Sequence, residues 1–140
     1  MHINYVAVFV ASLAQFIFGV VWYTPVFGKL WGKIHGFDKA SHAEQQKMMK
    51  QMGPLLGMQF FVTIITTVVL SVMLTGATSA WSTYELAGLC WIGFIVPTQI
   101  SAVLFGGTEP KWVVTKILIM AGGAFGCMMI AAAVLGRWSI

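Results

Sequence analysis

Charged side chains are scarce in this sequence. They make up 9% of its 140 residues, while 59% of the residues are hydrophobic; a typical soluble domain is about 25% charged. The charges are also unevenly distributed, because residues 1–28, 51–84, 86–108 and 117–136 contain none. Eight basic and four acidic side chains cannot cover the surface of a soluble protein that must hide so much apolar material. Composition therefore excludes an ordinary soluble domain.

The four uncharged runs predict the fold class. Each is long enough to cross the roughly 30 Å hydrocarbon core of a bilayer, since a helix rises about 1.5 Å per residue. We therefore expect an all-α integral membrane protein that forms a single domain over residues 1–140, with four transmembrane helices. The expected transmembrane helices cover residues 3–24, 54–75, 83–105 and 111–135.

Basic residues are confined almost entirely to two connections between these helices. Five lysines precede the second expected helix, two follow the third, and only Arg137 lies at the other end. The positive-inside rule then places both connections in the cytoplasm and both termini on the non-cytoplasmic side of the cell (inner) membrane, in a multi-pass protein. The basic pI near 9.3 indicates contact with anionic lipid rather than nucleic acid, so the expected partner is the lipid bilayer.

A short amphipathic cytoplasmic helix is expected between the first and second transmembrane helices, over residues 39–52. Ser41-x-x-Glu44 has the spacing of a capping box at its start. Gly53-Pro54 is expected to end it. The apolar edge beside its lysines consists of Met48, Met49 and Met52, which suits a helix lying on the inner leaflet.

Small residues recur at four-residue spacing in the first and last expected helices. Such spacing allows a second helix to approach closely, and a glutamine in the stripe can form a hydrogen bond across the contact. The candidate packing residues are Ala7, Ala11, Gln15 and Gly19 in the first helix and Gly122 and Gly126 in the last.

Aromatic and basic residues cluster where the first expected helix ends. Trp and Tyr prefer the headgroup layer, and lysines beside them reach phosphate. The candidate interfacial anchors are Trp22, Tyr23, Lys29, Trp31 and Lys33. At the opposite interface, Ser82-x-x-Glu85 predicts a second capping box at the start of the third helix.

The third expected helix is interrupted near its centre by Pro97-Thr98-Gln99. Because Pro97 has no N–H, the carbonyl of Gly93 loses its helical partner, and lipid cannot replace it. We expect a kink there, with the polar centre turned towards protein. Hydroxyl and amide side chains in the second helix either line a hydrated path or join helices. The candidate polar site therefore comprises Gln59, Thr63, Thr67, Pro97, Thr98 and Gln99.

Catalytic chemistry has little support in this sequence. We find no nucleophile paired with a base, no carboxylate dyad and no strong metal-ligand spacing. The group His35, Asp38, His42 and Glu44 matches no strong zinc motif. We expect no enzyme activity, no metal and no cofactor, with bound lipid or pigment left open. Cys90 and Cys127 are expected to be free apolar thiols, but their similar expected depth leaves a disulfide open.

Three stretches together resemble a known family. They are WYTPVFGKLW at the end of the first helix, WIGFIVPTQISAVLF in the third, and the closing LGRW. Their order and spacing are similar to a bacterial and fungal membrane family catalogued as domain of unknown function seventeen sixty-one. The resemblance covers nearly the whole chain and implies a four-helix membrane fold. It implies no activity, substrate or catalytic residue.

Two functions are expected from these features. Most of them serve packing and positioning, which favours a non-enzymatic helical bundle that forms a homo-oligomer or is an accessory or structural subunit of a larger membrane complex. The alternative is an oligomeric transporter or channel for a small solute or ion, which uses the polar centre of the third helix, because transporters bind their substrates at interrupted helices.

Overall fold

The structure is a computed structural model that describes residues 2–77 and 81–138. Within these residues, four helical stretches are long and apolar enough to cross a bilayer: Tyr5–Val26, His42–Gly76, Thr83–Phe105 and Pro110–Trp138. The prediction of an all-helical chain with four long apolar helices is confirmed. The individual helices are α1 (Tyr5–Val21), α2 (Gly28–Ile34), α3 (His42–Gly76), α4 (Thr83–Cys90), α5 (Val96–Phe105) and α6 (Val113–Trp138).

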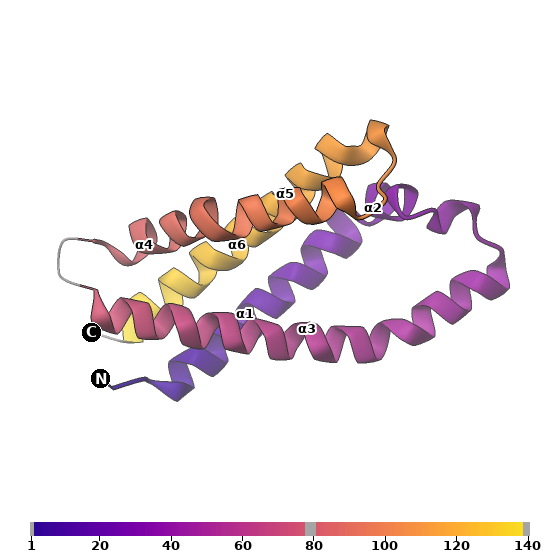
Figure 1. Cartoon of the computed structure of the whole chain (residues 1–140). Coiled ribbons are helices and arrows are strands. Elements are labelled where there is room, and N and C mark those ends of the chain that lie inside the picture. The colour runs from indigo at the N-terminus through magenta and orange to yellow at the C-terminus, as the bar shows by residue number, and fades with distance from the viewer. Residues whose placement is uncertain (1, 78–80, 139–140) are drawn as a thin grey trace.

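Helix α6 is the centre of the bundle. It packs against α1, α4 and α5, whereas α3 packs mainly against α1 and more lightly against α4 (Figure 1). The contacts are close because many of the buried side chains are small. The fully buried alanines are Ala7 and Ala11 on α1, Ala87 on α4, and Ala131 and Ala132 on α6.

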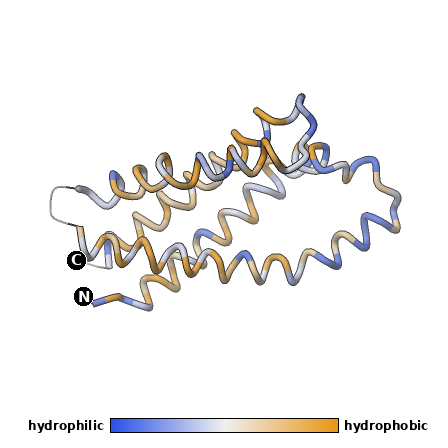
Figure 2. Tube along the Cα trace, in the orientation of Figure 1, coloured by the Kyte–Doolittle hydropathy of each residue, from blue (hydrophilic) through white to orange (hydrophobic). Residues whose placement is uncertain are grey.

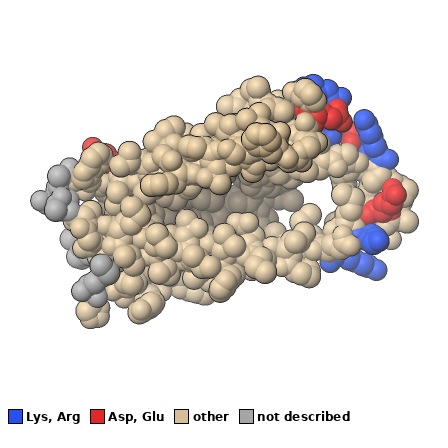
Figure 3. All heavy atoms as spheres, in the orientation of Figure 1, with Lys and Arg blue, Asp and Glu red and all other residues tan. Residues whose placement is uncertain are grey.

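The two ends of the bundle differ in polarity. Both termini lie at one end, where the Asn4 side-chain amide donates a hydrogen bond to the Trp138 carbonyl at 3.2 Å. Figure 2 shows a predominantly apolar body and a hydrophilic opposite end. Figure 3 shows the lysines and most of the carboxylates gathered at that opposite end. This segregation is what an even number of crossings with all basic connections on one side would produce.

Both predicted capping boxes are confirmed. The Ser41 hydroxyl accepts the Glu44 backbone N–H, and the Glu44 carboxylate accepts the Ser41 N–H at 2.8 Å. That backbone hydrogen bond, together with the bond to the serine side chain, lowers the pKa of Glu44. Ser82 and Glu85 form the same reciprocal pair at the start of α4. Each box satisfies two backbone N–H groups that a helix start leaves without partners.

Two prolines are accommodated by widened helical turns. Pro25 lies inside a π-helical turn, Trp22–Val26, in which the Phe27 N–H bonds the Trp22 carbonyl five residues back. A second π-helical turn, Trp91–Ile95, ends just before Pro97. A π-turn shifts the hydrogen-bond register by one residue, so the helix continues where a proline lacks its N–H. The first long helix therefore runs past residue 24 to Val26.

The predicted break at Gly53-Pro54 is wrong. Residues 39–52 do not form a separate helix, because α3 runs unbroken from His42 to Gly76 with Pro54 inside it. The proline removes one hydrogen bond, to the Lys50 carbonyl, and that stretch of the helix is exposed. Ala, Glu, Gln, Lys and Met dominate the preceding turns, and these strong helix formers offset the local cost.

Candidate functional site

Gln15 and Thr67 form a buried polar link between α1 and α3. The Gln15 Nε2 donates to Thr67 Oγ1 at 2.8 Å, and the Thr67 hydroxyl donates to the Thr63 carbonyl at 2.7 Å. Gln15 is only 3% exposed. Its Nε2 also donates to the Ala11 carbonyl at 3.1 Å. Gln15 thus lies within the predicted packing stripe and bonds across it.

Other predicted packing residues also make their contacts within the chain. A Cβ added at Gly122 would lie 3.0 Å from the Trp22 ring, and one at Gly126 would overlap the Phe18 ring. Ala7 and Ala11 are fully buried, whereas an added Cβ at Gly19 would meet nothing. An interface with another chain would therefore need other residues than Gly122 and Gly126.

Two tryptophans bind the backbone of α6, one from each π-helical turn. The Trp22 Nε1 donates to the Ile119 carbonyl at 2.9 Å, and the Trp91 Nε1 donates to the Ala121 carbonyl at 2.9 Å. The sequence-based prediction placed Trp22 in the headgroup layer and missed Trp91. The available signal was an indole N–H far inside an apolar run, since such a donor needs a protein acceptor where water is absent.

The residues of the predicted polar centre do not form one cluster of mutual hydrogen bonds. Thr63 and Thr98 each donate to a carbonyl of their own helix, Gln59 at 2.8 Å and Phe94 at 2.6 Å respectively. Pro97 and Thr98 are exposed, and α3 has α1 rather than α5 as its main packing partner. Hydroxyls bonded to their own helices are already satisfied, so they need no further partner.

Among residues 2–77 and 81–138, two buried polar side-chain atoms have no hydrogen-bond partner. They are the hydroxyl oxygen of Ser71 on α3 and the Oε1 of Gln99 on α5. Gln99 was predicted from the interrupted third helix, whereas Ser71 was not among the candidate site residues. An unpaired buried acceptor is costly, so it marks a position where a ligand or solvent would be stabilised.

Aromatic rings and Lys116 meet at the lysine-rich end. The Tyr23 and Trp31 rings lie 4.8 Å apart, and the Trp31 and His35 rings lie 4.5 Å apart, measured between centroids. The Lys116 Nζ lies 5.8 Å from the Trp31 ring centroid and donates to the Thr108 hydroxyl. A cation over an indole face is an attractive arrangement. Lys29 and Lys33 belong to α2, which lies at the same end of the bundle.

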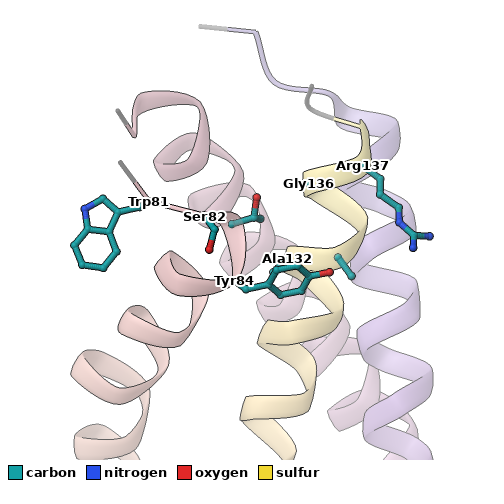
Figure 4. Close-up of a pocket in the computed structure, with 8 residues that line it drawn as sticks. Trp81, Ser82, Tyr84, Ala132, Gly136 and Arg137 are labelled. Atoms are coloured by element: carbon teal, nitrogen blue, oxygen red, sulfur yellow. The ribbon is translucent and has the colours of Figure 1, made fainter. Parts of the chain in front are cut away.

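A cavity of about 450 Å³ lies at the opposite end, between α4 and α6. Figure 4 shows the Tyr84 ring reaching towards α6, whereas Trp81 and Arg137 point outward on either side. The polar groups around the cavity therefore do not converge on one point, as those of a specific ligand site do. Its lining residues are Trp81, Ser82, Thr83, Tyr84, Ala132, Ala133, Gly136 and Arg137.

The two cysteines do not pair with each other. Cys90 and Cys127 are both free; the Cys90 thiol faces the Met73 sulfur at 3.9 Å, and the Cys127 thiol faces the Gln15 carbonyl at 3.7 Å. In the part of the chain that the structure describes, no three His, Cys, Asp or Glu side chains group together as metal ligands.

Comparison with known families settles the relationship of the chain. The family model described as "Protein of unknown function (DUF1761)" matches residues 6–136. The chain belongs to this family. The match confirms the resemblance inferred from the three aromatic, glycine and proline stretches. No curated protein and no solved structure matches the chain. Because the function of the DUF1761 family is unknown, membership assigns this protein no activity.

Proposed function

We propose that this DUF1761 protein is a non-catalytic, multi-pass membrane protein whose helical bundle associates with copies of itself or with a larger membrane complex. The observation that carries the proposal is the apolar surface. Phe94 is 70% exposed, Phe105 90% and Leu118 67%. They belong to a large set of exposed apolar side chains, and apolar surface of that extent is stabilised by lipid or by another apolar protein surface. In this proposal the bundle lies in the cell (inner) membrane with both termini on its non-cytoplasmic side.

The use of the polar side chains supports the same proposal. Gln15, Trp22 and Trp91 each donate a hydrogen bond to another helix. Polar groups committed to helix contacts stabilise a bundle in an apolar medium, and they leave few groups free for chemistry. The partners expected from this proposal are the bilayer and protein, with no resident metal or cofactor.

The open glycines of the third long helix suit an interface with another chain. A Cβ added at Gly88 or Gly93 would meet nothing within 4 Å, in contrast to Gly122 and Gly126. Exposed Leu89 follows Gly88 directly. Small residues beside apolar ones allow close approach of a second helix.

Native mass spectrometry of protein extracted gently from its membrane tests this proposal. Gly88→Ile combined with Gly93→Ile should reduce the assembled mass to that of one chain while helicity is retained, because an added Cβ at either position meets nothing within 4 Å in the monomer. Gly122→Ile with Gly126→Ile is the contrasting pair and should unfold the bundle, because the new atoms overlap Trp22 and Phe18. An assembled mass unchanged by the first pair would place the interface elsewhere. A foreign subunit present in stoichiometric amount would favour the accessory role.

A transporter or channel is the second candidate, and the unpaired Gln99 Oε1 favours it. An amide without a partner, close to Pro97 and to a π-helical turn, is the kind of group that binds solutes in membrane transporters. Gln99→Leu should abolish solute flux into reconstituted vesicles. Thr98→Val is a matched control, because the Thr98 hydroxyl already donates to the Phe94 carbonyl. Flux that persists in the Gln99 variant would remove this site from consideration.

A further inference from the structure

One face of α3 changes from buried to exposed along its length. Ser71, Thr67, Phe60, Leu56 and Met49 follow four- and seven-residue spacings and therefore share a face. Ser71 and Thr67 are each 1% exposed, but Leu56 is 39% and Met49 65% exposed. Phe60, between them, still packs edge-on against Phe16, with ring centroids 5.3 Å apart. The helix therefore leaves the bundle at about Phe60.

This divergence produces an opening. Figure 3 shows a gap through the space-filling view between α3 and the other helices, next to the end where the lysines gather. The inward face of α3 at this level carries Leu56 and Met49, so that wall is apolar. In a bilayer, such a wall is stable only when hydrocarbon or another apolar group covers it.

The charges beside the opening indicate the kind of molecule that covers it. Lys50 follows Met49 directly on α3, about 100° around the helix from it, and forms no ion pair with a described residue. The ion pair found in the described chain joins Lys111 to Glu109 at 3.1 Å. Unpaired lysines at a membrane surface attract anionic headgroups. Leu56 lies six residues further along α3 than Lys50, roughly 9 Å at 1.5 Å per residue, so an apolar side chain and a cation are spaced as the acyl chain and headgroup of an anionic phospholipid are.

We propose that an anionic phospholipid occupies this opening, with an acyl chain against Leu56 and its phosphate beside Lys50. The bound lipid extends the role of the bundle beyond association with protein. This inference rests on the membrane placement proposed above. A second copy of the chain is the competing occupant, and the experiment separates the two.

The first test uses the wild-type protein in native mass spectrometry with added phosphatidylglycerol or phosphatidylcholine. Each lysine near a headgroup favours the anionic lipid by about fivefold, so phosphatidylglycerol should remain bound at concentrations where phosphatidylcholine dissociates. Equal retention of the two lipids, or retention of neither, overturns the proposal. The number of chains in the same spectra reports self-association separately, so failure of one proposal is distinguishable from failure of the other.

Variants of adjacent leucines test the position of the lipid. Leu56→Trp should fill the opening and remove the bound phosphatidylglycerol. Leu55→Trp should retain it, because Leu55 is 64% exposed and lies on a different face of α3. Equal lipid retention in the two variants overturns the assignment. Loss of a dimer in Leu56→Trp without loss of lipid would also overturn it and assign the opening to a second copy. Should Leu56→Trp fail to fold, Leu56→Gln and Leu55→Gln provide the same comparison.

Charge variants test the headgroup contact. Lys50→Gln should lower the preference for phosphatidylglycerol over phosphatidylcholine by about fivefold. Lys111→Gln removes the same charge but from a lysine already paired with Glu109, so it should leave the preference nearly unchanged. An equal loss of preference in both variants would indicate that the lipid responds to net charge alone, and would contradict a headgroup site on α3.

Discussion

The hydrogen bond between Gln15 and Thr67 shows how single residues hold this bundle together. Lipid tails are as apolar as leucine, so burial of apolar side chains gives helices little reason to associate in a membrane. A side-chain amide that reaches the neighbouring helix supplies a specific attraction instead. Since the Thr67 hydroxyl donates its own proton to the Thr63 carbonyl, both of its hydrogen-bonding roles are used.

We predict a measurable coupling between these two residues. In a double-mutant cycle with Gln15→Leu and Thr67→Val, the interaction free energy should be about 1 kcal/mol, as found for hydrogen bonds between membrane helices. Unfolding by SDS in mixed micelles measures it. Thr66→Val is the matched control, because Thr66 donates only to the Val62 carbonyl of its own helix. A Gln15 cycle with Thr66 as large as that with Thr67 would show that the coupling is not due to this bond.

At the scale of the helices, the three interior prolines are accommodated differently. Pro25 and Pro97 are accompanied by π-helical turns, and each of those turns begins with a tryptophan that bonds α6. Pro54 has no such turn, and α3 passes through it as an α-helix. The helices that contain Pro25 and Pro97 pack against α6, whereas α3 packs mainly against α1.

Replacement of Pro54 tests the continuity of α3. Pro54→Ala restores an N–H opposite the Lys50 carbonyl, so the free energy of unfolding should rise by about 1–3 kcal/mol. Hydrogen exchange should show the new backbone amide at position 54 protected together with its neighbours. Gln51→Ala, at an exposed position of the same helix, should change stability much less. Rapid exchange over residues 50–58 in Pro54→Ala would show that the helix is interrupted there after all.

At the scale of the whole molecule, the sequence predicts an all-helical chain with four long apolar helices, as the structure has within the described residues. Uncharged runs longer than a bilayer is thick allow few other structures, and the two Ser-x-x-Glu boxes fix where two helices begin. The predicted break at Gly53-Pro54 was wrong. Glycine and proline do favour a helix end, but the strong helix formers that precede them keep α3 helical. The partners of Gly122 and Gly126 were also beyond prediction, since Phe18 and Trp22 are about a hundred residues away in the chain and only the packed bundle brings them together.

The central position of α6 has a consequence for synthesis. Its closest partner is α1, and the Asn4–Trp138 hydrogen bond joins residues at opposite ends of the described chain. Helices α1 and α3 leave the ribosome before α6 exists, so the indoles of Trp22 and Trp91 have no acceptors until the last helix is made. Helices α1 and α3 can already pair through the Gln15–Thr67 hydrogen bond, but α1, α4 and α5 gain the partner that they share only when α6 is made. Truncation within α6 would therefore leave α1, α4 and α5 without the packing partner that they share.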